Sequence, residues 1–226
     1  MENNTNEVSS LMSELEELLT TKKDLPELKN MGAYIDISFE NSLNFEISDN
    51  VKQLENIIEK AYNNGTPTQE WQSVQEQICN NGQTLAQDKL IPTIIMMKAK
   101  LHDFNGMQPL FKSALSLNKD SNSVWMVKKV CDSYPENVNT IEKLCNETND
   151  IGILCNIVEL DVLPLDDVAK RIAETPIKSQ EDISALHEFG ESYAMRINSD
   201  IRKALKLKYD ELNMSNVSQQ SMEDGM

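Results

Sequence analysis

Residues 121–160 read SNSVWMVKKVCDSYPENVNTIEKLCNETNDIGILCNIVEL, and this stretch decides the fold class. Its apolar residues recur three and four positions apart within three segments, 121–134, 138–146 and 151–160, which is the spacing of amphipathic helices. Brief polar connectors separate the segments. Helices of about ten residues joined by short turns are typical of a compact helical bundle or a short helical array.

The residues upstream of this stretch show the same signals for the starts and ends of helices. Asp49 precedes an apolar stripe that ends at Asn63-Asn64-Gly65, and Thr66-Pro67 opens the next stripe. We therefore predict a mainly α fold, with one helical domain over residues 49–212.

The C-terminal region predicts the longest helix. Ser179 is a good N-cap, and helical character continues from it to about residue 212. Gly190 and the pair Ser199-Asp200 are the places where this long C-terminal helix would break. Residues 213–226 are polar without an apolar period, which predicts a disordered tail.

Residues 1–24 predict an acidic amphipathic helical arm. Apolar side chains follow the spacing of one helix face, while the glutamates lie mainly off it. We expect this face to bind another protein, and its candidate contact residues are Leu11, Met12, Leu15, Leu18 and Leu19. The same spacing also fits a helix that packs on its own body, and the pattern alone does not separate the two.

Residues 25–48 predict a linker followed by a small β-hairpin. Ile35, Ile37 and Phe39 alternate with polar residues, and a second alternation follows a short polar turn at Leu43, Phe45 and Ile47. A period of two on both arms is typical of two strands with one buried face. An isolated hairpin is marginally stable, so we expect it to pack on the helices or to offer an edge to another chain.

The sequence offers no catalytic or metal-binding constellation. None of the glycine-rich or nucleophile motifs occurs, and the two histidines lie 85 positions apart. The four cysteines form no C-x-x-C pair and fall on apolar stripes, where a free thiol behaves as a small hydrophobe. We therefore expect no enzyme activity, no catalytic residue, no metal and no cofactor.

Charge is distributed unevenly along a chain whose net charge is −16. Such acidity disfavours nonspecific contact with nucleic acid or anionic lipid and favours basic partners. A local exception is a basic strip near the C-terminus, which is a candidate for contact with phosphate or an acidic partner. Its candidate residues are Arg196, Arg202, Lys203 and Lys206.

These observations favour a non-enzymatic protein–protein interaction or scaffold subunit that uses the N-terminal helix and could form a homo-oligomer. The alternative is an RNA-binding nucleoprotein-like or assembly subunit that uses the basic strip. No diagnostic motif of a known family is present. Because no secretory signal is visible and no purely apolar run exceeds the four residues of Ile94–Met97, we expect a cytoplasmic protein, with the nucleus as alternative, and no membrane partner.

Overall fold

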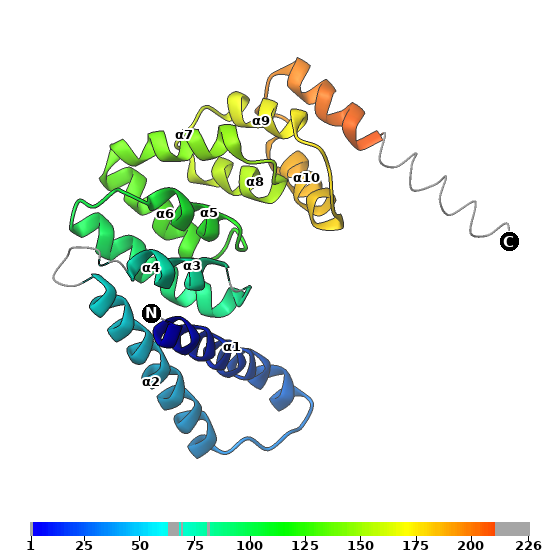
Figure 1. Ribbon diagram of the computed structural model, residues 1–226. Coiled ribbons are helices and arrows are strands. Elements are labelled where there is room, and N and C mark those ends of the chain that lie inside the picture. The colour runs from blue at the N-terminus through cyan, green and yellow to red at the C-terminus, as the bar shows by residue number, and fades with distance from the viewer. Residues whose placement is uncertain (1, 63–67, 69, 81, 211–226) are drawn as a thin grey trace, which may run out of the picture. The chain divides into compact units, whose positions relative to one another are not determined.

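The computed structural model describes residues 2–62, 68, 70–80 and 82–210 (Figure 1). Every regular element in these described ranges is a helix, and no strand occurs among them. The mainly α fold is therefore confirmed. The chain divides into two compact units, Met1–Pro135 (unit 1) and Glu136–Met226 (unit 2).

The described part of unit 1 contains six helices. They are α1 (Glu2–Asn30), α2 (Ile37–Tyr62), α3 (Trp71–Asn80), α4 (Thr84–Lys100), α5 (Met107–Leu115) and α6 (Asn122–Ser133). Helix α4 contacts all five of the others, and its residues Leu90, Ile91, Ile94 and Ile95 are fully buried. Since apolar burial is the main favourable term in folding, α4 is the centre of the unit 1 core.

Helix α1 is part of this core. It contacts α2, α3 and α4, and Val8, Met12 and Leu15 are fully buried. A Glu16 carboxylate oxygen accepts a hydrogen bond from the backbone N–H of Ala86 at 2.7 Å, in the first turn of α4. A carboxylate at that position pairs with the positive end of the helix dipole. The predicted boundary at residue 24 falls inside α1.

The β-hairpin prediction for residues 35–47 is wrong. Helix α2 covers most of this segment and runs on without interruption to Tyr62. Leu43 and Ile47 are four positions apart, so they fit one helix face as well as one strand face, and they start a buried stripe that continues with Leu54. Phe45 then faces the other side of the helix and is 71% exposed.

Unit 2 is built from shorter helices. A 3-10 turn at Pro135–Asn137 leads into α7 (Val138–Glu147), α8 (Ile151–Leu160), α9 (Leu165–Glu174) and α10 (Gln180–Tyr193), and residues 199–210 form a further helix. Helix α8 contacts α7, α9 and α10, and its Ile151, Leu154 and Leu160 are fully buried. The last segment of the stretch that predicted the fold class, residues 151–160, is thus the centre of the unit 2 core.

The long C-terminal helix begins where predicted but is not continuous. The Ser179 hydroxyl accepts a hydrogen bond from the Asp182 N–H, and Asp182 reciprocates in a capping box. The helix ends at Tyr193, and residues 194–198 leave the helical path. Asn198 starts the next helix as its N-cap, because its side-chain oxygen accepts from the Asp200 N–H at 2.9 Å. The predicted tail, 213–226, lies outside the described residues.

Candidate functional site

The turn between α1 and α2 exposes the densest group of large apolar side chains. We call residues 28–45 the α1–α2 tip. Of the ten exposed large hydrophobic residues in the described part of the chain, six lie in this tip: Leu28, Met31, Tyr34, Ile37, Phe39 and Phe45. Soluble proteins seldom concentrate exposed apolar residues in this way unless the surface meets another molecule.

The tip presents these side chains on an ordered scaffold. Asp36 caps α2, since its side-chain oxygen accepts from the Ser38 N–H at 3.1 Å, and this bond lowers the pKa of Asp36. Lys29 of α1 and Glu40 of α2 form an ion pair at 2.5 Å across the turn. Figure 1 shows this end of the α1–α2 pair away from α3 and α4.

Ile37 and Phe45 lie on the outward side of α2. They are eight positions apart, which places them about 80° apart around the helix and about 12 Å apart along its axis. Ile37 is 75% and Phe45 71% exposed, whereas Leu43 and Ile47, on the side of the helix opposite Phe45, are buried. Together with Tyr34, which is 94% exposed and precedes the helix, these side chains form what we call the exposed apolar row.

The residues predicted to bind a partner occupy a different environment. Leu11, Met12 and Leu15 are buried within unit 1, and Leu18 and Leu19 are half-buried. A partner could reach Leu11, Met12 and Leu15 only if α1 left the helices against which it packs. The exposed apolar surface near the N-terminus is therefore the α1–α2 tip, and the hydrophobic row on α1 serves the core.

Lys98 is a buried cation in unit 1 that the sequence analysis did not single out. Its Nζ atom lies 2.6 Å from an Asp103 carboxylate oxygen and donates to the Tyr62 hydroxyl at 3.3 Å. The Tyr62 hydroxyl also donates to Asp103, and the rings of Tyr62 and Trp71 lie 5.3 and 5.7 Å from Nζ. Burial outweighs these attractions and lowers the pKa of Lys98 to about 8.

A tight helix end brings Asp103 to Lys98. His102 adopts a left-handed conformation with φ of 52°, and the Asp103 N–H donates to the Lys98 carbonyl at 3.0 Å. This is a Schellman arrangement, with a histidine in place of the usual glycine. The sequence contained a signal for this ion pair, because Lys98 follows the apolar residues of a helix and Asp103 comes five positions later. Lys98 is 1% exposed, so this cluster has no access for a substrate and ties helices together.

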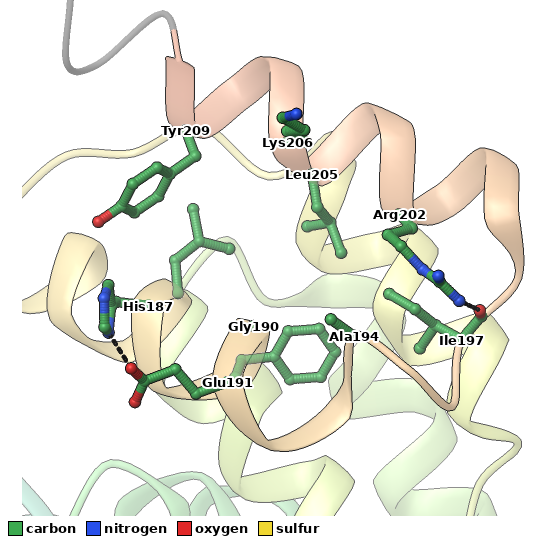
Figure 2. A pocket seen from close by; sticks show the side chains of 11 residues that line it. His187, Gly190, Glu191, Ala194, Ile197, Arg202, Leu205, Lys206 and Tyr209 are labelled. Carbon is green, nitrogen blue, oxygen red and sulfur yellow. Dashed lines mark hydrogen bonds and ion pairs between the residues drawn. The ribbon is translucent and has the colours of Figure 1, made fainter.

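A groove in unit 2 lies between α10 and the helix over residues 199–210, and we call it the α10 groove (Figure 2). Its volume is about 380 Å³. Leu186, Phe189, Ile197 and Leu205 form an apolar floor, and each is at most 9% exposed. Apolar hollows of this size with a few polar groups at the mouth are typical of ligand sites.

Polar groups stand at both ends of the α10 groove. Figure 2 shows Arg202 beside Ile197 at one end and His187 with Tyr209 at the other. The Arg202 guanidinium donates to the Ile197 carbonyl at 3.1 Å. His187 and Glu191, one turn apart on α10, approach within 3.7 Å.

The predicted basic strip separates into different environments. Arg202 and Lys206 line the α10 groove, but Lys203 pairs with Asp200 at 3.2 Å and the Arg196 guanidinium lies over the Tyr193 ring. Lys208, a further base of the same stretch, reaches inward and donates to the Ile172 carbonyl at 2.8 Å, at the negative end of α9.

The thiols of the chain are held in their neutral form. Burial raises the pKa of Cys131 and Cys155 to about 12 and also raises those of Cys79 and Cys145. In the described ranges, no three histidine, cysteine or acidic side chains gather as metal ligands. The same ranges contain no helix that is both long and apolar enough to span a bilayer.

No protein-family model, curated protein or solved structure gives a significant match to this chain. Its function is therefore inferred from its own residues.

Proposed function

We propose that this chain is a non-enzymatic protein–protein interaction or scaffold subunit that binds another protein through the α1–α2 tip. The observation that carries the proposal is the exposed apolar row at Tyr34, Ile37 and Phe45. Leaving large apolar side chains in water forgoes roughly 1.5–3 kcal/mol for each one that could be buried. A partner that covers this row recovers that free energy.

The proposal moves the binding surface away from the hydrophobic face of α1. That face already lies against α2, α3 and α4, so its burial stabilises unit 1. Helix α1 still contributes to the proposed surface, because its last turn carries Leu28 and Lys29, and Lys29 pairs with Glu40 of α2. Aromatic and long aliphatic side chains in a compact cluster are the usual anchors of protein interfaces.

The charges near the apolar row indicate what kind of protein would fit. Glu46 and Asp49 follow Phe45 on α2, and Asp36 precedes Ile37, all of them exposed. Lys52 is the nearest exposed base along the same helix. We propose a partner surface with an apolar centre and basic edges, which also suits the net charge of −16.

The test compares three forms of the full chain as immobilised bait. Ile37→Asp with Phe45→Asp places charges on the tip without touching the core, because both side chains are exposed. Leu207→Asp is the matched control, since Leu207 is 63% exposed and lies in unit 2. A protein retained in stoichiometric amounts by the wild type and the control, and lost with the tip variant, supports the proposal. Retention of every partner by the tip variant refutes it.

The alternative of an RNA-binding subunit draws less support from the geometry. Arg202 and Lys206 of the basic strip line the same groove, and the floor of that groove is apolar. The ratio of absorbance at 260 and 280 nm, measured on protein purified at low salt, separates the two proposals. Co-purifying nucleic acid that is lost on replacing Arg202 and Lys206 with glutamine would favour the RNA-binding subunit.

A further inference from the structure

The α10 groove has the features of a ligand site that is separate from the α1–α2 tip. It is concave, and its floor consists of Leu186, Phe189, Ile197 and Leu205. Leu186 and Phe189 come from α10, Leu205 from the helix over residues 199–210 and Ile197 from the segment that joins them, so the groove runs between the two helices (Figure 2). A ligand that fills it must be mainly apolar.

The cations of the groove specify the polar part of that ligand. Arg202 and Lys206 are four positions apart on one helix face and both line the hollow. Arg202 is held by the Ile197 carbonyl, which leaves its remaining N–H groups as donors, and no hydrogen bond or ion pair engages Lys206 among the described residues. Two neighbouring cations in a chain of net charge −16 form a local site for one anionic group.

The other end of the groove does not compete for the anion. Glu191 lies there on α10, and its carboxylate faces His187 on the same helix. Tyr209 closes this end with an aromatic ring 5.9 Å from the His187 ring. An anionic head group therefore lies by Arg202 and Lys206, and the apolar part extends toward Tyr209.

The length of the groove sets the length of the ligand. Arg202 marks the head-group end of the groove, and seven residue steps, about 10 Å along the helix axis, separate it from Tyr209. Lys206 lies between these two ends and lines the same groove. An extended chain advances about 1.2 Å per bond, so about eight bonds cover this distance. We propose that the α10 groove binds a medium-chain carboxylate, with its head group on Arg202 and Lys206 and its alkyl chain over Phe189 and Leu205.

Calorimetric titration of the full chain with sodium decanoate tests this proposal. We expect one site per chain and binding that weakens about tenfold or more when Arg202→Gln and Lys206→Gln are combined. Lys203→Gln is the matched control, because Lys203 is on the same helix but pairs with Asp200 outside the groove. The control should bind decanoate with unchanged affinity.

A second variant and a second ligand keep the test decisive. Ala194 is a small residue in the lining, and Ala194→Leu fills the hollow without removing a charge, so decanoate binding should be lost while the circular dichroism spectrum is unchanged. Decan-1-ol has the same chain without the carboxylate and should bind at least tenfold more weakly.

Four results would overturn the proposal. The first is a wild type that does not bind decanoate, and the second is a wild type that binds decanoate and decan-1-ol equally. The third is decanoate binding that survives the Ala194→Leu substitution. The fourth is a wild-type dimer in light scattering that Ala194→Leu converts to monomer, because the groove would then be covered by a second copy of the chain.

Discussion

The buried Lys98 gives a prediction about pH and stability whose sign is unusual. Below pH 8, Lys98 carries its charge in both the folded and the unfolded protein, and folding bears the full cost of burying that charge. Between the folded pKa of about 8 and the usual lysine value of 10.5, the folded protein has released the proton and the unfolded chain still holds it. The free energy of unfolding therefore rises with pH in this window.

The magnitude follows from the difference between the two pKa values. Proton linkage makes the Lys98 contribution to the free energy of unfolding grow by about 1 kcal/mol between pH 7 and pH 9. The buried thiols act in the opposite sense above pH 9, because Cys131 and Cys155 hold their protons to about pH 12 when folded and lose them near pH 9 when unfolded. The pH dependence of the wild-type free energy of unfolding therefore combines the opposing effects of the lysine and the thiols.

A comparison with Lys98→Met isolates the lysine. Methionine is an unbranched side chain one heavy atom shorter than lysine and has no titrating group, and the cysteines are common to both proteins. Both tryptophans of the chain, Trp71 and Trp125, lie in unit 1, so urea unfolding followed by tryptophan fluorescence reports on that unit. Between pH 7 and pH 9, we expect the free energy of unfolding of the wild type to rise by about 1 kcal/mol relative to that of the variant. Parallel curves would refute the assigned pKa and its cause.

Three further substitutions test the local assignments of the fold. The Asn50 amide is buried without a hydrogen-bond partner among the described residues, so Asn50→Leu should stabilise unit 1 by about 1–2 kcal/mol in the same fluorescence assay. Asp161 ends α8 with a φ of 53°, and Asp161→Gly should raise the free energy of unfolding of unit 2 by about 0.5–1 kcal/mol, measured by hydrogen exchange of the α8 amides. Ser179→Ala removes the cap of α10 and should cost about 1 kcal/mol by hydrogen exchange of α10. If a substitution leaves its readout unchanged, the corresponding assignment is contradicted.

Helical content was predictable from the sequence because the apolar spacing is locally consistent. The stretch from Ile151 to Leu160 is helical as expected, and Ser179 caps α10. Residues 35–47 misled the prediction because Leu43 and Ile47 satisfy both a period of two and a spacing of four. Only the continuation of the stripe to Leu54 and Ile58 distinguishes the helix, and the expected turn at Asn41 divided that stripe.

The candidate sites depend on tertiary contacts that one sequence does not reveal. The spacing of Leu11, Met12 and Leu15 identified a hydrophobic face, but only the packing of α1 on α3 and α4 shows that this face is occupied. Arg202 and Lys206 were among the candidates by charge alone. Their apolar surroundings arise because Asn198 starts a new helix that folds back on α10, which brings Leu205 toward Phe189.

Hydrogen–deuterium exchange on the chain with and without its bound protein partner tests the central proposal most directly. We predict slower exchange in residues 28–45 on binding, with unit 2 unchanged. Unchanged exchange in residues 28–45, with protection elsewhere, would contradict the assignment of the α1–α2 tip as the binding surface.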